Sequence, residues 1–341
     1  MAARVLIPGG YGIFGRLLAD ELRKRTDAHL VIAGRSLEAA ARACVPHRGR
    51  ASAIELDLND LDAVADAARG CDLVACCAGP FQALPRAVID AATGAGAHWL
   101  DIADDRAWVL GALWDRITDE RARAAGRGVL TGLSSVPLLA LLLLRWGLAR
   151  LPGADRADVT LFIGNRNDKG TGSVSSAITT GFHRPEPVDS PLGRRLAFAF
   201  DSPVEPLARE LGVEARFRVA LGYVLAGPVV AAASAVPRPL RESTARALTI
   251  ASRPISSIGD ARGAVVVALI RGTETETVSL VGDDQRFAIL PLAIAAEELL
   301  AGKPAVGSID ASTWLEPEVW LERLCARGLK LMRRRTGSLM E

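Results

Sequence analysis

The sequence lacks the residue patterns of several common enzyme classes. Tyrosine occurs only at Tyr11 and Tyr223, and neither has a lysine four residues later, so the Tyr-x-x-x-Lys pair of short-chain dehydrogenases is absent. A Gly-x-Ser-x-Gly turn, which would carry the nucleophile of a serine hydrolase, is also missing. No cluster of His, Glu and Cys residues predicts a catalytic metal. These absences leave all three chemistries without support.

Charge and cysteine content exclude further classes. The net charge of +2 is too small to predict a general attraction to nucleic acid or to anionic membranes. The five cysteines are odd in number and include no Cys-x-x-Cys pair. We therefore expect a reduced, cytoplasmic protein with neither a zinc site nor a disulfide framework. These cysteines are Cys44, Cys71, Cys76, Cys77 and Cys325.

Long apolar runs are missing as well. The longest, residues 136–144, stops at Arg145 and is too short to span a bilayer. We expect a buried helix there, with an interfacial membrane contact as the alternative. The first predicted strand begins at Arg4, which leaves no room for a signal peptide before it.

A glycine-rich turn near the N-terminus is the strongest pattern present. An apolar run at residues 5–7 precedes it, and a helix-like segment, residues 16–25, follows at once. Gly10-x-Gly12-x-x-Gly15 thus stands between a strand and a helix, as in the dinucleotide-binding fingerprint. The alternative is a glycine-rich loop in another α/β fold. The expected cofactor contacts in this turn are Gly10, Tyr11, Gly12, Ile13, Phe14 and Gly15.

The end of the next predicted strand, residues 29–36, indicates which dinucleotide binds. Sites that prefer NAD carry an Asp or Glu about 20 residues after the glycines, where it bonds the ribose 2′-hydroxyl. This chain has Gly34 there, followed by Arg35 and Ser36. A guanidinium and a hydroxyl can bind a 2′-phosphate, and no carboxylate repels it. We therefore expect NADP(H) rather than NAD(H), with a solvated loop arginine as the alternative reading of Arg35.

Two later strand ends supply further expected contacts with the cofactor. Residues 51–57 alternate like a strand and place Asp57 and Leu58 beside the adenine, while Asp60 caps the following helix. The continuous apolar run within residues 71–81 predicts a central parallel strand with its cysteines in the core. The expected contacts after this strand are Cys77, Ala78, Gly79, Pro80 and Phe81.

A fifth predicted strand begins at residue 98 and ends in three carboxylates, Asp101, Asp104 and Asp105. The carboxyl ends of strands in a doubly wound sheet line the ligand crevice. Asp104 is therefore a candidate proton donor. The alternative is that Asp104 or Asp105 caps the helix that begins near Ala107.

With a sixth strand near residue 128, the alternation of strands and helices predicts an α/β fold with a Rossmann-type doubly wound parallel sheet.

In the second half, residues 264–271 and 275–281 predict an antiparallel hairpin. Residues 180–206 predict a loop-rich lid or pocket wall. The basic residues 330–335 predict a solvated tail, with anion or membrane binding as the alternative.

The motifs GGYGIFG, AGRS, DLND, CAGPF, LDIADD and GLSSVP occur in this order and resemble those of saccharopine-dehydrogenase-like oxidoreductases. Residues 170–176, 283–301 and 313–324 are similar to later segments of that family. The resemblance implies an NADP-binding Rossmann domain, residues 1–150. It further implies an inserted α+β domain with an antiparallel sheet, residues 151–285, and C-terminal helices that return to the first domain, residues 286–341. Because members act on imines, polyamine precursors and lipid enoyl groups, the family does not identify the substrate.

These expectations lead to a hypothesis about function. Hydride transfer belongs to a nicotinamide, whereas the protein orients it and supplies a proton. Candidate proton donors are Lys169, Tyr223 and Asp104, with His98 and His183 as histidine alternatives. We expect an NADP(H)-dependent oxidoreductase that reduces a C=N or C=C bond in a small or lipid-like molecule. The alternative, favoured by the lack of an obvious acid–base pair, is a non-catalytic NADP-binding redox sensor.

A small-molecule substrate is expected, and nucleic acid is not. The edge strand of the second domain favours a homodimer across a two-fold axis. The apolar residues 138–144 and the basic tail suggest a third reading, a peripheral lipid-associated protein.

Overall fold

The computed structural model describes residues 2–167, 183–222, 229, 232–233, 236–237, 240–252 and 259–336. The chain divides into two compact units. One consists of Met1–Ser134 and Ala288–Trp314, and the other consists of Ser135–Phe287 and Leu315–Glu341. Each unit contains its own seven-stranded sheet.

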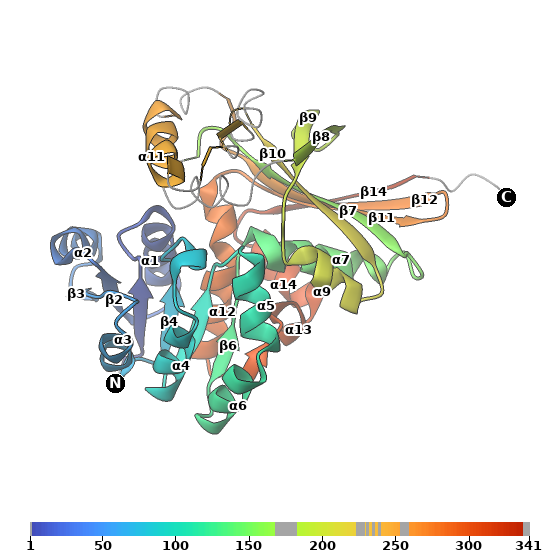
Figure 1. Cartoon of the computed structure of the whole chain (residues 1–341). Coiled ribbons are helices and arrows are strands. Elements are labelled where there is room, and N and C mark those ends of the chain that lie inside the picture. The colour runs from blue at the N-terminus through green and yellow to red at the C-terminus, as the bar shows by residue number, and fades with distance from the viewer. Residues whose placement is uncertain are drawn as a thin grey trace. The chain divides into compact units, whose positions relative to one another are not determined.

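The first unit is built on a parallel sheet with the strand order β13-β6-β5-β4-β1-β2-β3 (Figure 1). Its apolar strands form the core, and Val5, Leu6 and Ile7 of β1 are fully buried. The order reverses between β1 and β4, which is where such sheets bind ligands at their carboxyl ends. The strands are β1 (Arg4–Pro8), β2 (His29–Gly34), β3 (Ala51–Glu55), β4 (Leu73–Cys76), β5 (His98–Asp101), β6 (Gly128–Leu130) and β13 (Gly307–Ile309).

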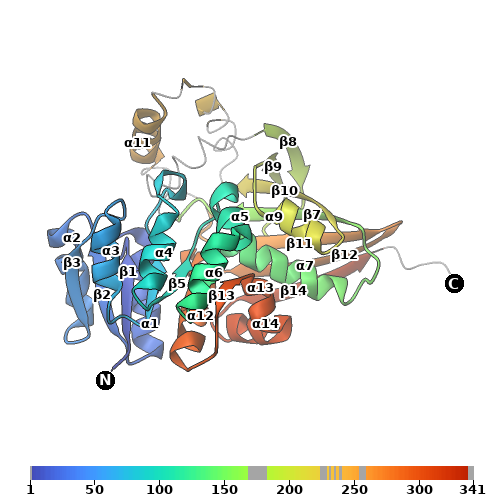
Figure 2. The ribbon, with the colours of Figure 1, turned by 60° about the horizontal axis from the view of Figure 1, so that its bottom comes forward.

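Helices cover both faces of this sheet. α1 packs against α12, while α3 packs against α4 and α4 against α6, and right-handed crossovers place these two groups on opposite faces. Figure 2 shows α3, α4 and α6 in a row in front of the strands. The helices are α1 (Ile13–Arg25), α2 (Leu37–Cys44), α3 (Leu61–Ala68), α4 (Ala87–Gly94), α5 (Arg106–Trp114), α6 (Arg116–Ala124), α12 (Leu290–Leu300) and α13 (Ala311–Trp314).

Short polar side chains begin several of these helices. Ser36 Oγ accepts a hydrogen bond from the Ala39 N–H and so caps α2. The Asp60 carboxylate accepts from the Ala63 N–H at the start of α3, which confirms the predicted cap. Such caps satisfy backbone donors that have no partner within the helix.

The second unit is a mixed sheet with the order β14-β12-β11-β7-β10-β9-β8. β7 and β10 run parallel, and the other neighbours are antiparallel. The predicted hairpin is confirmed, because β11 and β12 pair from Gly263↔Gly282 to Arg271↔Glu274. The strands are β7 (Arg156–Ile163), β8 (His183–Val188), β9 (Arg195–Ala199), β10 (Glu214–Leu221), β11 (Gly263–Arg271), β12 (Glu274–Gly282) and β14 (Lys330–Thr336).

Helix α7 (Ala140–Leu148) covers β11 and β12, with α9 (Val204–Glu210) and α14 (Pro317–Cys325) beside it. A kinked segment, Ser135–Leu139, in which Val136 is extended, precedes α7, and the leucines of the long apolar run are buried. A Cβ on Gly147 would collide with Leu269 of β11, so glycine permits this close packing. The run is thus a core helix. Nowhere in the described ranges is a helix both long and apolar enough to cross a bilayer.

Three sequence-based assignments differ from the structure. Residues 330–335, predicted as a solvated tail, are largely exposed but form β14, in which Arg333 pairs with the fully buried Glu276 of β12. The predicted loop at 180–206 contains β8, β9 and the start of α9, and β9 packs Phe198 into the core. The predicted six strands of the first sheet become seven, because β13 adds to β6.

The predicted domain boundaries also differ from the observed division. A boundary at residue 150 assigns α7 to the first domain, whereas α7 packs within the second unit. Residues 315–336 were expected to return to the first domain but group with the second, because β14 pairs with β12.

Candidate functional site

Three glycines at and after the turn between β1 and α1, Gly10, Gly12 and Gly15, have little or no space for a Cβ. The Gly10 N–H donates to the Ile7 carbonyl over 3.0 Å, and the Gly12 N–H donates to the Gly9 carbonyl over 2.8 Å. A Cβ on Gly10 would lie 2.8 Å from the Ile7 oxygen, and a Cβ on Gly15 would lie 2.5 Å from Gly10 Cα. The turn is therefore tight, and α1 packs directly on the chain that leads into it.

The N-terminus of α1 suits an anion. Its N-cap, Gly12, has no side chain to accept from the N–H groups of the first turn, and that turn contains no acidic residue. These N–H groups and the helix dipole favour a negatively charged ligand such as a phosphate. The backbone of Ile13 and Phe14 forms this first turn. The residues present thus fit a dinucleotide pyrophosphate.

At the carboxyl end of β2 the structure brings together Tyr11, Gly34, Arg35 and Ser36. The Tyr11 ring lies against Gly34: a Cβ there would stand 2.9 Å from Tyr11 Cζ and 3.0 Å from its Oη. Arg35 and Ser36 are exposed. Because Ser36 Oγ already accepts from Ala39 as the cap of α2, its hydroxyl is fixed at the start of that helix.

The end of β3 contributes carboxylates. Asp57 Oδ1 accepts from the backbone N–H of Asn59 over 3.0 Å and from its side chain over 2.9 Å. These hydrogen bonds, with a contribution from the Arg35 charge, lower the pKa of Asp57. Leu58, the second predicted adenine contact, is only 6% exposed. Glu55, which sequence reasoning missed, is exposed and stands in register with Gly34.

The segment after β4 packs against the glycine turn. The Cys77 N–H donates to the Pro8 carbonyl over 2.9 Å, and a Cβ on Gly9 would lie 2.7 Å from the Ala78 nitrogen. Burial raises the pKa of the Cys76 and Cys77 thiols, so neither thiol suits a reactive thiolate. The small residues Ala78 and Gly79 then lead through Pro80 to Phe81.

Asp101, at the end of β5, is a buried structural carboxylate. It is 0% exposed and accepts hydrogen bonds from five different residues, at distances of 2.8 to 3.0 Å. It therefore joins β5, the N-terminal part of α5 and the segment after β6. The donors are Trp99 Nε1, Ala103 N, Trp108 Nε1, Thr131 Oγ1 and Gly132 N. The sequence indicates the acid at the end of a strand, but it contains no local pattern that predicts these partners.

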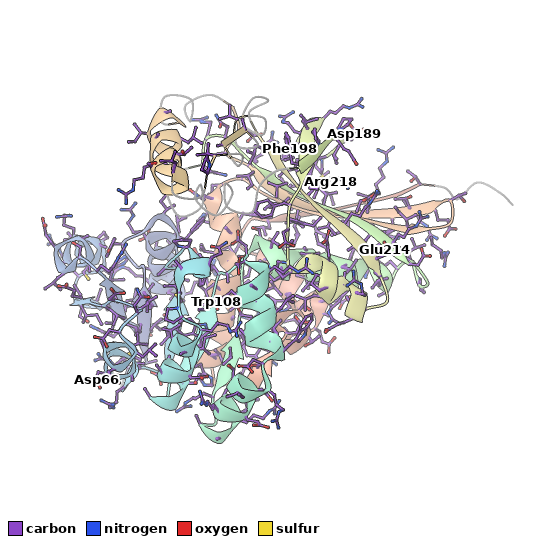
Figure 3. The ribbon with its side chains drawn as sticks, viewed as in Figure 1. Asp66, Trp108, Asp189, Phe198, Glu214 and Arg218 are labelled. Carbon is purple, nitrogen blue, oxygen red and sulfur yellow. The ribbon has the colours of Figure 1, made fainter. Side chains whose placement is uncertain are left out.

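Trp108 connects this carboxylate to the segment after β4. Its ring centroid lies 5.2 Å from that of Phe81 and 6.5 Å from that of Trp99. Trp108, labelled in Figure 3, is 3% exposed. The two strand ends are thus held by aromatic packing as well as by the Asp101 hydrogen bonds.

The two remaining acids of this loop differ from each other. Asp105 caps α5, since its Oδ1 accepts from the Trp108 N–H over 2.8 Å. The Asp104 side chain reaches solvent, but the surrounding protein desolvates its carboxyl and, with the adjacent Asp105, raises the pKa of Asp104 to about 6. Such a carboxyl exchanges protons near neutral pH. Of the other predicted proton donors, Lys169 and Tyr223 lie outside the described residues.

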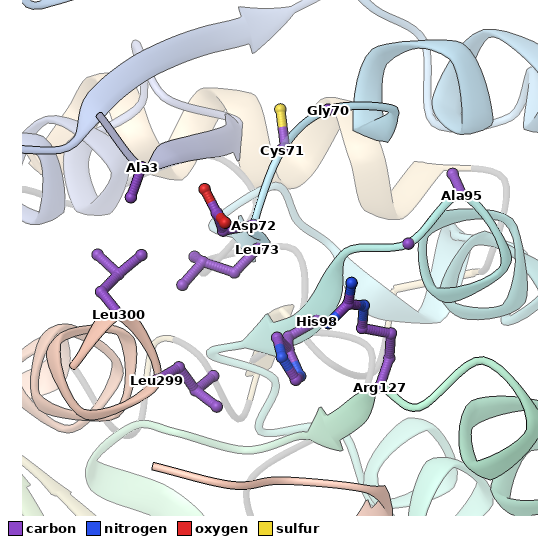
Figure 4. A pocket seen from close by; sticks show the side chains of 11 residues that line it. Ala3, Gly70, Cys71, Asp72, Leu73, Ala95, His98, Arg127, Leu299 and Leu300 are labelled. Atoms are coloured by element: carbon purple, nitrogen blue, oxygen red, sulfur yellow. The ribbon is translucent and has the colours of Figure 1, made fainter. Parts of the chain in front are cut away.

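His98, an alternative proton donor in the sequence analysis, has a structural role. Its Nδ1 accepts from the Gly128 N–H over 2.9 Å, and burial lowers the pKa of the ring. It borders a hollow of about 550 Å³ that Asp72 and Arg127 also line (Figure 4). These residues lie at the amino ends of the parallel strands. The hollow is therefore at the edge opposite the glycine turn and does not belong to the candidate site.

Comparisons with known proteins agree with this geometry. A protein-family model described as NAD(P)H-binding matches residues 9–100, which include the glycine turn and the ends of β2 to β4. A search of curated proteins finds no significant match.

Similar folds occur among solved structures. The chain is similar to apo saccharopine dehydrogenase (L-Glu forming) from Saccharomyces cerevisiae, with 15% identity and a TM-score of 0.66 over 98% of this chain and 100% of that one. An oxidoreductase domain protein from Kribbella flavida gives 12% identity and a TM-score of 0.47 over 97% and 98% of the two chains. The first likeness confirms the predicted fold class. The chain thus combines an NAD(P)H-binding Rossmann domain with a saccharopine-dehydrogenase-like fold.

Proposed function

We propose that the protein is an NADP(H)-dependent oxidoreductase that reduces a C=N or C=C bond in a small or lipid-like substrate. The observation that carries the proposal is the turn between β1 and α1, where three glycines admit no Cβ without close contact and the helix N-terminus has no side-chain cap. This arrangement fits a pyrophosphate, and a bound NADPH supplies the hydride.

The preference for NADP(H) is supported by the end of β2. Gly34 contributes no carboxylate, and Arg35 is exposed beside it. A guanidinium binds phosphate through charge-assisted hydrogen bonds, which are stronger than those between neutral groups. Glu55 and Asp57 lie nearby and oppose a 2′-phosphate, so the charge of Arg35 is needed to offset them.

Asp104 is our candidate for the proton donor among the described residues. With a pKa of about 6, its carboxyl holds a proton in an appreciable fraction of molecules near neutral pH. It follows β5, whose carboxyl end lies at the ligand-binding edge of the sheet. Lys169 and Tyr223 remain proposed alternatives.

Turnover of NADPH tests this function. The purified protein is mixed with NADPH and a panel of cyclic imines and enoyl compounds, and loss of reduced nicotinamide is followed. We expect oxidation with at least one compound, and we expect Asp104→Asn to slow it by about 100-fold. Lys169→Met and Tyr223→Phe are measured in parallel to identify the donor. Binding of NADPH without oxidation by any compound would favour the redox-sensor alternative instead.

A further inference from the structure

The Tyr11 ring occupies a position that matters for nucleotide choice. A side chain at residue 34 would require the ring to move, because a Cβ there would meet Tyr11 Cε1 and would lie 2.9 Å from Cζ and 3.0 Å from Oη. Tyr11 is half-buried, and Gly34 is the last residue of β2. The ring therefore covers the end of this strand.

This is the place where NAD-binding sites carry their carboxylate. An Asp or Glu at the end of the second strand accepts a hydrogen bond from the ribose 2′-hydroxyl. In this chain the missing carboxylate is replaced by a phenol that lies over the glycine. A phenolic hydroxyl can donate a hydrogen bond to a phosphate oxygen without adding charge.

We propose that Tyr11 and Gly34 form a coupled pair that determines nucleotide specificity. The ring keeps a carboxylate from the end of β2, and the hydroxyl, together with Arg35, binds the 2′-phosphate. The inference rests on the proposed function, since it assigns a role within the same nucleotide site. It predicts that specificity cannot be changed at residue 34 alone.

The carboxylates near the end of β2 favour a neutral hydrogen-bond donor for the 2′-phosphate. The neighbouring carboxylates are Glu55, in register with Gly34, and Asp57, which Asn59 holds in its ionised form. Arg35 lies close enough to Asp57 for its charge to help lower the pKa of that carboxyl. Asp57 competes with the phosphate for the charge of Arg35. The neutral Tyr11 hydroxyl adds a hydrogen bond to the phosphate that does not depend on this charge.

The experiment measures the Kd for NADPH and for NADH in a set of variants. Tyr11→Phe keeps the ring and removes the hydroxyl, and we expect it to weaken NADPH binding about fivefold while NADH binding stays within about twofold. Gly34→Asp alone is expected to weaken NADPH by about 100-fold without improving NADH, because the new side chain competes with the ring for space. Tyr11→Ala combined with Gly34→Asp is expected to bind NADH about tenfold more tightly than Gly34→Asp does.

A stability measurement tests the contact without any nucleotide. Gly34→Ala is expected to lower the Tm by about 2 °C, and adding Tyr11→Ala is expected to cost less than the two single changes together. Strict additivity would overturn the proposed coupling.

The binding results separate two kinds of failure. If the unaltered protein bound neither nucleotide, the proposed function and this inference would both fall. If it preferred NADPH, but Gly34→Asp alone improved NADH binding as much as the double variant, only this inference would be overturned. An unchanged NADPH affinity in Tyr11→Phe would also overturn it, because the hydroxyl would then not bind the phosphate.

Discussion

At the scale of single residues, Asp101 shows how a buried carboxylate can be structural. Both of its oxygens only accept hydrogen bonds, and they receive indole, hydroxyl and backbone donors. Burying a carboxylate costs free energy unless its oxygens accept hydrogen bonds, and here both oxygens accept them. Its place at the end of β5 therefore does not make it a catalytic acid.

We predict that Asp101→Asn destabilises the protein by about 3 kcal/mol, measured by chemical denaturation. Either orientation of the amide turns its NH₂ group toward donors, so no rotation restores the network. Asp105→Asn is the matched control, since asparagine caps helices about as well as aspartate, and it should cost less than about 1 kcal/mol. Equal losses in the two variants would contradict this account of Asp101.

Asp104 is the acid of this loop whose carboxyl is desolvated by the surrounding protein, and the adjacent Asp105 charge adds to that effect on its pKa. Its pKa in the folded protein, about 6, lies above the ordinary value of 3.8. Between these two pH values the folded state binds the proton more tightly than the unfolded state. The contribution of Asp104 to stability is therefore full below the lower value and is lost as the pH rises through the upper one.

Thermal unfolding across this range tests the assignment. The Tm of Asp104→Asn, relative to that of the unaltered protein, is expected to rise as the pH goes from about 4 to about 7, because asparagine does not ionise. The same pH dependence in both proteins would show that this carboxyl has an ordinary pKa.

At the scale of secondary-structure elements, helix α1 depends on the glycine turn that precedes it. Gly15 lies inside the helix, where glycine costs stability relative to alanine. Its position against Gly9 and Gly10 explains why glycine occupies this site, since a Cβ has no space there. The same principle holds at Gly147, where α7 approaches β11.

We expect Gly15→Ala to destabilise the protein by about 2 kcal/mol and to weaken NADPH binding at least tenfold, because the helix must move away from the turn. Gly94→Ala is the control. Gly94 ends α4, and a Cβ there would meet no atom within 4 Å. This change should be neutral or slightly stabilising. If Gly15→Ala behaved like the control in stability and in binding, close packing at the turn would be disproved.

At the scale of the whole molecule, local patterns predicted the nucleotide half well. β1 to β6 follow from apolar runs that end in glycine, aspartate or serine, because these residues begin the next turn or cap the next helix. β13 has the sequence Gly-Ser-Ile, which contains no apolar run, and only its pairing with β6 makes it a strand.

The second half was harder to predict for a physical reason. β14 consists largely of basic residues and looks solvated in the sequence. Its pairing with β12 and the ion pair between Arg333 and Glu276 hold it in the sheet, and both partners are about 50 residues or more away along the chain. Such long-range contacts leave no local pattern.

The site was predicted in part. Gly10, Gly12 and Gly15 lie where the motif requires, and Arg35 lies at the end of the expected strand. The contact of Tyr11 with Gly34 could not be read from spacing, because it depends on how the ring folds back over β2. The register that brings Glu55 beside Gly34 is likewise set by strand pairing.

The central claim is that the first unit binds NADP(H) and recognises its 2′-phosphate at the end of β2. Equilibrium titration with NADPH and NADH, followed by fluorescence, tests it most directly in the unaltered protein, in Arg35→Ala and in Arg116→Ala. Arg116→Ala is the control. It removes a charge of the same sign from α6, where the Arg116 side chain is 83% exposed.

We predict that NADPH binds more tightly than NADH and that Arg35→Ala weakens NADPH binding at least tenfold, while NADH binding in that variant and both affinities in the control stay within about twofold. Equal affinity for the two nucleotides, or an NADPH affinity that Arg35→Ala leaves unchanged, would contradict the claim.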